Sequence, residues 1–247
     1  MSLVVEQLSA AYGKTPVIKG IGFKVESGEL IGLIGPNGSG KSALLKTLAG
    51  LIKPVSGQVL WQDENVHTMT ARARAKTISW LDQNREVGWN LSVREVVALG
   101  RAPWRGALGR LSRADEAAIE QALELAQCQD LHARGFSELS GGEQARVLLA
   151  RALAVDARLI LADEPVAALD PAYQLMGLQI LQAQTRRGKT VIVSLHNLAL
   201  ARQFCSRLLV MDKGQLVAGG PGKTALSDDI LESVFGIRYR NGEMLNA

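Results

Sequence analysis

A glycine-rich run with one lysine is the stretch of this sequence best suited to chemistry on a phosphate. It reads Gly35-Pro36-Asn37-Gly38-Ser39-Gly40-Lys41-Ser42 and matches the phosphate-loop pattern G-x-x-x-x-G-K-S/T in full. Glycines let backbone N–H groups turn towards phosphate oxygens, and a helix start adds about half a positive charge. Lys41 is predicted to reach the β- and γ-phosphates and Ser42 to bind Mg²⁺. The alternative is a glycine-rich turn that binds nothing.

The elements on either side favour phosphate binding. Leu30–Ile34 is short and apolar, which is typical of a buried strand. Leu44, Leu45 and Leu48 fall on one face of a helix that is predicted to stop near Gly50. A strand, a glycine turn and a helix start in this order form an anion-binding cradle.

Two carboxylates follow a second apolar strand. The run Leu159-Ile160-Leu161-Ala162 leads into Asp163, Glu164 and Pro165. Sites in parallel sheets lie at the carboxyl ends of strands, so Asp163 is predicted to bind Mg²⁺ opposite Ser42. Glu164 is predicted to be the base that polarises an attacking water, a role that typically contributes about 10²–10⁴-fold. The alternative is the start of a helix, with acids near its N-terminus and proline at its first position.

Another glycine pair precedes a strong helix. In Leu139-Ser140-Gly141-Gly142-Glu143-Gln144, Ser140 and Glu143 have the spacing of a capping box. Capping does not explain the glycines, because each weakens a helix by about 1 kcal/mol relative to alanine. Their presence indicates a close approach to another group, and a phosphate is the candidate.

The order of periodic segments predicts an α/β chain. Residues 1–30 are expected to form an antiparallel edge sheet from short strands at Val4–Val5, Val17–Ile18 and Phe23–Val25, which glycine turns separate. Residues 92–154 have helical spacing and predict an all-helical insert. Further strands are expected at 57–61, 77–81, 158–162 and 190–195, a hairpin at 208–217 and a last helix at 228–235.

Composition excludes several classes of protein. A chain of 247 residues with 47% hydrophobic residues can bury a sizeable core in one or two domains. Its net charge is 28 − 24 = +4 without a dense basic block, and aromatics are 4%, which argues against nucleic-acid binding. Cys128 and Cys205 predict neither a disulfide nor a zinc site, and a reducing compartment is expected. Residues 1–10 do not have the pattern of a signal peptide, and no apolar run is long enough to span a bilayer.

Together these motifs resemble the ATP-binding cassette (ABC) ATPases over essentially the whole chain. The phosphate loop resembles the family's Walker A motif, and Leu159–Asp163 with Glu164 resembles Walker B. Leu139–Glu143 resembles the L-S-G-G-Q signature, with Glu143 in place of the usual glutamine. Gln83 resembles the Q-loop residue and His196 the H-loop residue. Ala168-Leu169-Asp170 resembles the D-loop, although Val166-Ala167 replaces the usual small hydroxyl residues; Tyr12 stands where the family stacks an aromatic on adenine.

The resemblance implies ATP and Mg²⁺ as cofactors and assigns the site residues. Glu164, His196, Gln83 and Lys41 are expected to be catalytic, and Ser42, Gln83 and Asp163 to hold the metal. Nucleotide contacts are expected from Tyr12, Gly35, Pro36, Asn37, Gly38, Ser39, Gly40, Lys41, Ser42, Ala43, Ser140, Gly141, Gly142 and Asp170. Ala43 replaces a common hydroxyl residue, so one hydrogen bond to the α-phosphate is expected to be missing, worth about 0.5–1.5 kcal/mol. Asn197 replaces a frequent aspartate, for which the sequence offers no explanation.

The resemblance also implies the architecture and the partners. The fold expected is a P-loop NTPase with a RecA-like, mostly parallel core, an N-terminal antiparallel β subdomain and an inserted α-helical subdomain. Within a single ABC ATPase domain, residues 1–83 and 155–247 are expected to form the core with the β subdomain, and residues 84–154 the helical subdomain. Two copies are expected to face each other head to tail, so that Ser140 and Gly142 serve the nucleotide of the partner. A membrane permease is an expected partner, which places the chain peripherally on the cytoplasmic face of the cell membrane. Nucleic acid is not an expected partner.

One segment narrows the type of transporter. The runs 90–103 and 106–112 are similar to the ATPases of importers for ferric siderophores, haem and cobalamin. A ferric siderophore is the favoured cargo, delivered by a substrate-binding protein that this chain does not touch. Residues 84–110 are expected to dock on the permease, with contributions from Arg101 and Trp104. The alternatives are another type of ABC transporter and a soluble non-transport ABC ATPase.

Overall fold

The structure is a computed structural model that describes residues 2–84, 87, 89–106, 109–167, 169–240 and 243–246. For residues 239–240 and 243–246 it describes the backbone only. Ala168 of the expected D-loop lies outside the described residues, as do positions 85, 86, 88, 107 and 108 of the expected docking segment.

The central element is a six-stranded sheet in the order β10-β9-β3-β8-β7-β6. All neighbours pair in parallel except β10, which joins β9 as a hairpin. The strands are β3 (Leu30–Ile34), β6 (Ile78–Leu81), β7 (Leu159–Ala162), β8 (Thr190–Ser194), β9 (Arg207–Asp212) and β10 (Gln215–Gly220). Every residue of β3, β7 and β8 is buried, as expected for parallel strands covered on both faces.

A second sheet is antiparallel and has the strand order β2-β1-β4-β5. Its strands are β1 (Ser2–Tyr12), β2 (Thr15–Glu26), β4 (Ser56–Trp61) and β5 (Glu64–Asn65). The prediction of separate short strands at Val17–Ile18 and Phe23–Val25 was wrong, because both belong to β2. Gly20 adopts φ +61° within β2, and the pairing with β1 shifts register nearby, so bulges absorb the glycines that were taken for turns.

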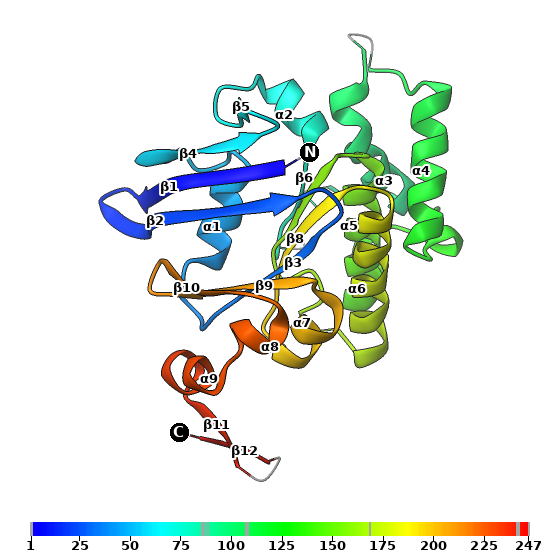
Figure 1. Cartoon of the computed structure of the whole chain (residues 1–247). Helices are drawn as coiled ribbons and strands as arrows, with labels where there is room; N and C mark the ends of the chain where they lie inside the picture. Colours follow the sequence, from blue (N-terminus) through cyan, green and yellow to red (C-terminus); the bar gives the residue numbers. More distant parts are fainter. Residues whose placement is uncertain are drawn as a thin grey trace.

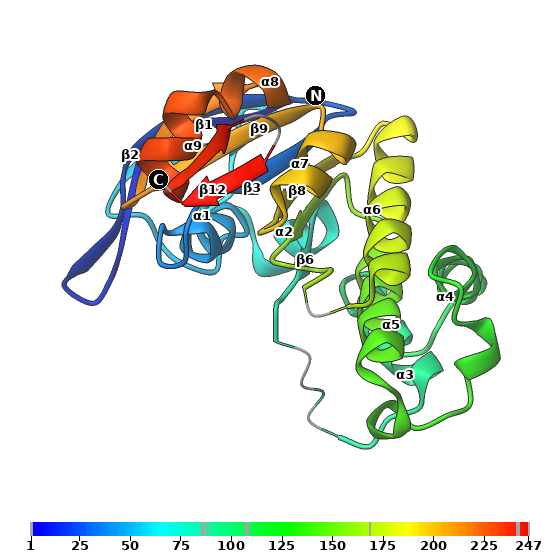
Figure 2. The same ribbon diagram turned by 90° about the horizontal axis from the view of Figure 1, so that it is seen from below.

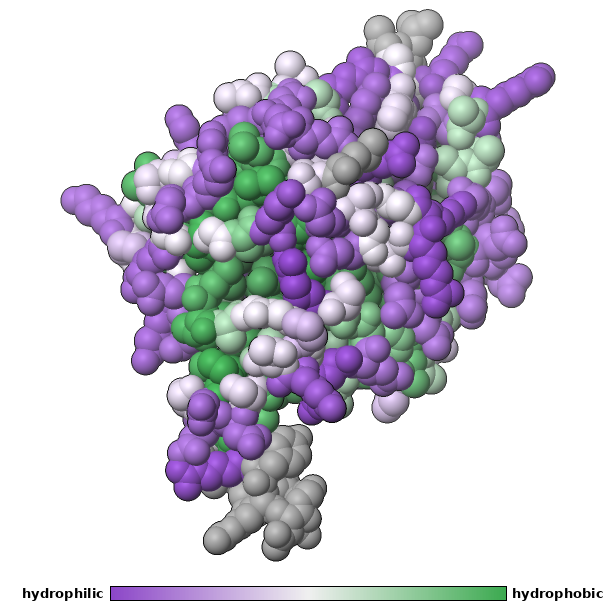
Figure 3. All heavy atoms as spheres, viewed as in Figure 1, coloured by the Kyte–Doolittle hydropathy of each residue, from purple (hydrophilic) through white to green (hydrophobic). Residues whose placement is uncertain are grey.

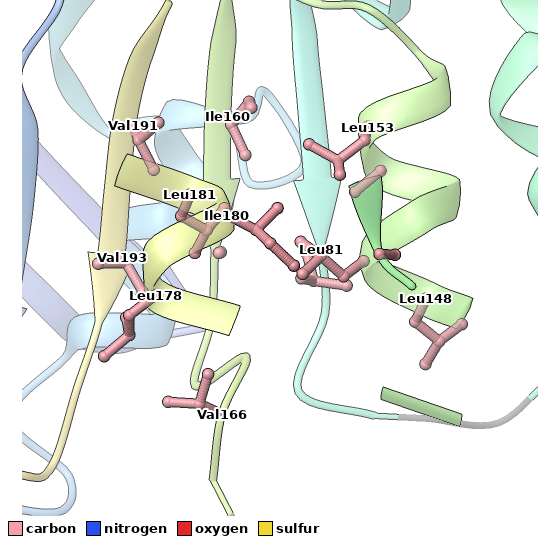
Figure 4. Close-up of a cluster of buried hydrophobic side chains, with 14 of the residues drawn as sticks. Leu81, Leu148, Leu153, Ile160, Val166, Leu178, Ile180, Leu181, Val191 and Val193 are labelled. Carbon is pink, nitrogen blue, oxygen red and sulfur yellow. The ribbon is translucent and has the colours of Figure 1, made fainter. Parts of the chain in front are cut away.

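Alternate residues of the central sheet enter two separate cores. Ile31 and Leu33 of β3 join a cluster with the antiparallel sheet and α1 (Lys41–Leu48). Leu30 and Ile34 face the opposite cluster, built with the helices. Figure 1 shows the antiparallel sheet on one side of the central sheet and helices on the other. Figure 4 shows side chains of α6 (Pro171–Arg186) and α5 (Gly141–Ala154) packed beside the strands. Figure 3 shows apolar side chains reaching the surface near β2 and β9–β10, whereas the α3–α4 side is more hydrophilic.

Within the described residues, the named elements between Val93 and Ala154 are helices. They are α3 (Val93–Ala98), η1 (Leu99–Trp104), α4 (Arg113–Leu125), η2 (Gln129–Leu131), η3 (Phe136–Glu138) and α5. Figure 2 shows α3, α4 and α5 gathered on the side away from β11 and β12. Residues of α3, α4 and α5 share one hydrophobic cluster with the central sheet, so the helical segment packs onto the core.

The remaining elements are short, and all except α2 come after β8 in the chain. They are α2 (Ala71–Thr77), α7 (Leu198–Phe204), α8 (Gly222–Ala225), α9 (Asp228–Phe235), β11 (Ile237–Arg240) and β12 (Glu243–Asn246). The predicted helix at 228–235 is confirmed as α9. Among the helices of the described residues, none has the length and apolarity needed to cross a membrane.

Arg101 has a structural position that contradicts its expected role in docking. Its side chain is buried, its Nε donates to Asp115 Oδ1 at 2.8 Å, and its Nη1 donates to the carbonyl of Ala154 at 2.7 Å. Hydrogen bonds from the hydroxyl and backbone N–H of Ser112, and then from Arg101, lower the pKa of Asp115 to about 2. Arg101 therefore holds η1 to α4 and to the end of α5, and is not available to a partner.

We expect Arg101→Ala to lower the free energy of unfolding by about 3–5 kcal/mol, since it leaves a buried carboxylate without its cationic partner. Arg94→Ala is the matched control, because Arg94 pairs with Glu116 and Glu120 on the exposed side of α4. Such exposed pairs contribute about 0–1 kcal/mol. Chemical denaturation of both variants measures the difference, and equal losses would contradict the buried clamp.

The lowered pKa of Asp115 also sets a pH window. A carboxyl group with a lowered folded-state pKa stabilises the fold above its unfolded value, near pH 4, and loses that contribution as the pH falls towards about 2. The difference in stability between wild type and Asp115→Asn should therefore be constant above pH 4 and shrink below it.

Candidate active site

The phosphate loop lies between the end of β3 and the start of α1, against β2 and β9. Gly35 has φ +151°, and a Cβ there would come within 2.2 Å of the Met211 carbonyl. Gly40 has φ +102°, and its Cβ would lie 2.8 Å from the Val17 carbonyl. Side chains at these positions would collide with backbone, so the loop conformation depends on glycine.

Lys41 folds back over this loop. Its Nζ donates to the carbonyl of Gly35 at 2.8 Å and to that of Pro36 at 3.1 Å. Burial lowers the pKa of the ammonium, and the charges of Glu164 and Asp163 oppose that shift. A desolvated cation next to the loop amides is suited to binding a phosphate.

A cavity of about 530 Å³ opens beside the loop. Loop and helix residues 37–43 line it, together with Tyr12 from the end of β1 and Glu164 from the end of β7. The structure thus brings most of the residues predicted for the nucleotide into one cavity. Ala43 also lines it, although its side chain offers no hydroxyl group.

Asp163 is a buried carboxylate at the end of β7. Its Oδ1 accepts a hydrogen bond from the Ser194 hydroxyl at 2.7 Å, while Oδ2 accepts none among the described residues. A carboxylate oxygen, the Ser42 hydroxyl and nucleotide phosphates are the oxygen donors that Mg²⁺ prefers, so the residues present fit this metal. Within the described residues, no group of three or more His, Cys, Asp or Glu could hold a metal without such additional donors.

Glu164 joins two of the other predicted catalytic residues. Gln83 Nε2 donates to Glu164 Oε2 at 2.9 Å, and His196 Nε2 contacts Glu164 Oε1. Glu164 has φ +48°, a conformation that is strained for a residue with a side chain. The alternative of a helix start at this point was wrong, because Pro165 lies in a turn and α6 begins only at Pro171.

The glycine pair after Ser140 stands apart from this cavity. Ser140 caps α5, and Glu143 Oε2 accepts from its N–H at 2.9 Å and its hydroxyl at 3.0 Å. These bonds lower the pKa of Glu143. Ser140, Gly141, Gly142 and Asp170 are not among the described residues that line the cavity. Asp170 precedes α6 as its N-cap without a side-chain capping bond.

Sequence reasoning missed two lysines in the cavity. Lys19 of β2 and Lys213 of the β9–β10 turn line it, as does Gly214. The Gly214 N–H donates to the Ser39 carbonyl at 3.0 Å, and the Lys19 N–H donates to the Gly214 carbonyl at 2.9 Å. The sequence does show a hairpin turn at 212–214, but its contact with a loop more than 170 positions earlier carries no local signal.

Comparisons with known proteins agree with this geometry. Residues 18–167 match the family described as ABC transporter, and the chain belongs to the ATP-binding subunits of this family. It is an ATPase of the ABC type. The chain is 40% identical over 223 residues to the hemin import ATP-binding protein HmuV of Streptomyces coelicolor, covering 90% of this chain and 79% of that protein.

Two further relatives extend the comparison. The iron(3+)-hydroxamate import ATP-binding protein FhuC of Bacillus subtilis is 35% identical over 237 residues, covering 96% of this chain and 88% of that protein. A solved dimeric ATP-binding cassette in a post-hydrolysis state, bound to ADP and Pi, is 27% identical with a TM-score of 0.80, covering 90% of this chain and 99% of that one.

The lysines that line the cavity generate a prediction. Lys19, Lys41 and Lys213 line the cavity together with one carboxylate, so its lining carries a net positive charge that attracts the phosphates of ATP. Lys19→Ala and Lys213→Ala should therefore each weaken ATP binding by up to about 5-fold, the range of an exposed ion pair. The loss should shrink as salt is added. Lys53→Ala is the control, because Lys53 is exposed and does not line the cavity. Calorimetric titration with ATP measures all three, and a loss equal to that of Lys53→Ala would contradict the assignment.

Proposed function

We propose that this chain is the ATP-hydrolysing subunit of an importer for an iron chelate, either haem or a ferric siderophore, with cobalamin as the remaining candidate. The support is the resemblance of residues 90–103, together with relatives named for the import of hemin and of iron(3+)-hydroxamate. The cargo is carried by other subunits, so the residues of this chain serve ATP.

The proposed mechanism gives each of these residues a separate task. Lys41 and the loop amides hold the β- and γ-phosphates, and Tyr12 stacks on the base. Ser42, Asp163 and Gln83 would hold Mg²⁺, which would neutralise phosphate charge. Glu164 accepts a proton from the attacking water. In the structure Glu164 is engaged by both Gln83 and His196. When these two side chains contact the γ-phosphate region instead, the carboxylate of Glu164 is released and can bind the attacking water.

The signature residues act, in this proposal, on the nucleotide of a second copy. A Cβ added at Gly142 would make only ordinary contact, 3.5 Å from the Tyr173 ring. Nothing in the described chain therefore requires glycine at this position, whereas a phosphate from a facing subunit would. The solved dimeric cassette supports the association of two copies that this proposal needs. Ser140 and Gly142 then donate to the γ-phosphate, and removal of one such donor costs on the order of 10²–10³ in rate.

The observation that carries the proposal is the junction of Gln83, Glu164 and His196 beside the phosphate loop.

We expect Glu164→Gln to lower hydrolysis by about 10²–10⁴-fold while ATP binding persists, because only the proton acceptor is lost. ATP and Mg²⁺ should then hold this variant as a dimer in size-exclusion chromatography. Glu124→Gln on the exposed face of α4 is the control and should behave as wild type. A Glu164→Gln variant that elutes only as a monomer with ATP would contradict the proposal.

The permease is proposed to dock on the segment between Gln83 and the helices, which would place the chain peripherally on the cytoplasmic face of the membrane. Trp89 in this segment is 79% exposed, the largest exposed fraction among the big apolar side chains of the described residues. Leu99 and Trp104 are also partly exposed nearby in sequence. Tryptophan is one of the residue types enriched among the side chains that dominate protein interfaces.

We expect Trp89→Ala to reduce co-purification with the permease by about tenfold or more, since an interface anchor contributes at least about 1–2 kcal/mol. ATP binding by the isolated chain should not change. Val55→Ala is the matched control, because Val55 is 72% exposed and lies near the antiparallel sheet. Unchanged co-purification of the Trp89 variant would place the docking surface elsewhere.

A further inference from the structure

The hydroxyl of Ser194 lies between the two acidic residues at the end of β7. Ser194 is the last residue of β8 and is fully buried. Its hydroxyl donates to Asp163 Oδ1 at 2.7 Å, and its Oγ accepts the N–H of Glu164 at 2.8 Å. A serine hydroxyl has one proton and a backbone N–H can only donate, so both directions are fixed while Asp163 is ionised.

Strand pairing explains why Ser194 reaches both residues. In the parallel register, Ala162 of β7 lies opposite Val193 of β8. Ser194 and Asp163 are the next residues along the chain, at the edge where the sheet ends. A hydroxyl at this point is within reach of the carboxylate and of the peptide that follows it. Ser194 also lines a cavity of about 220 Å³ together with Glu164 and His196.

The accepted N–H belongs to the residue with strained backbone. Glu164 has φ +48°, and such conformations persist where the surroundings hold them. By accepting this N–H, Ser194 fixes the peptide plane between Asp163 and Glu164. The direction in which the Glu164 side chain leaves the strand end follows from that plane, and Glu164 is the partner of Gln83 and His196.

The donated bond has a separate effect on Asp163. It occupies Oδ1 and leaves Oδ2 without a hydrogen bond among the described residues. Partners that hold a metal-binding carboxylate in one orientation increase both metal affinity and activity. One hydroxyl thus orients the carboxylate assigned to Mg²⁺ and the backbone of the residue assigned to water.

We propose that Ser194 is a positioning residue that couples the metal-binding carboxylate of Asp163 to the catalytic carboxylate of Glu164. Ser194 is not among the residues that line the cavity beside the phosphate loop, and it acts through these two residues. The inference rests on the proposed function, because Asp163 and Glu164 hold their roles only if this site hydrolyses ATP.

The test compares Ser194→Ala with a matched buried serine. Ser79 on β6 is equally buried, and its hydroxyl donates to the Ala152 carbonyl at 2.8 Å, away from the cavity. We expect Ser194→Ala to lower kcat by about 10–100-fold, the usual effect of removing a partner of a metal ligand, with KM for ATP nearly unchanged. Ser79→Ala should lose thermal stability comparably but keep its kcat and its metal requirement.

A second readout does not depend on turnover. In the Glu164→Gln background, which preserves ATP, Mn²⁺ is titrated into the ATP-bound protein and followed by electron paramagnetic resonance. Adding Ser194→Ala should weaken Mn²⁺ binding by about tenfold or more. ATP affinity measured in EDTA should stay the same, because Ser194 does not line the cavity proposed for the nucleotide.

A graded series keeps the test informative if Ser194→Ala folds poorly. Ser194→Thr retains the hydroxyl and should restore much of the rate, whereas Ser194→Cys provides only a weak donor and acceptor and should fall between Thr and Ala. The proposal is overturned if Ser194→Ala matches Ser79→Ala in kcat and Mn²⁺ affinity, or if ATP affinity in EDTA falls in parallel. Should Glu164→Gln itself retain full hydrolysis, the proposed function would fail instead, so the two failures are distinguishable.

Discussion

Parallel strand pairing brings the whole site to one edge of the central sheet. Leu33 lies opposite Ser194, Ala162 opposite Val193, and Leu81 opposite Ala162. The chain therefore leaves β3, β8, β7 and β6 at neighbouring points, and the residues that follow are the phosphate loop, His196, Asp163 and Gln83. An antiparallel pairing of any two of these strands would send one of the groups to the far edge. The contacts of Glu164 with Gln83 and His196 exist because four strands point the same way.

Burial on both faces of the sheet gives this edge its rigidity. Strands β3, β7 and β8 are buried throughout, with alternate side chains in two clusters. A shift of any of these strands by one residue would move its apolar side chains from one core to the other. The strained backbone of Glu164 and the desolvated ammonium of Lys41 are both unfavourable in isolation, and a rigid frame lets them persist.

The sequence predicted the parts of the site that local pattern determines. The strand before Gly35, the helix after Lys41 and the strand before Asp163 follow from apolar runs and glycine spacing, and all three are present. Long-range contacts could not be predicted in this way. The position of Lys213 depends on a turn docking against Ser39, and Arg101 looks like a surface residue until Asp115 and the end of α5 are placed around it. Glycines in β2 were misleading, since a bulge and a turn use the same residue type.

The clamp at Arg101 has a mechanical consequence for the signature residues. It binds the carbonyl of Ala154, the last residue of α5, whereas Ser140 lies at the opposite end of that helix. With a rise of 1.5 Å per residue, the two ends are roughly 20 Å apart. Because α5 is clamped at this end, any rotation of the helix about the clamp would displace Ser140 more than any other residue of the helix. A rotation of about 10° would move the serine by roughly 3.5 Å over this length, which is more than a hydrogen bond tolerates.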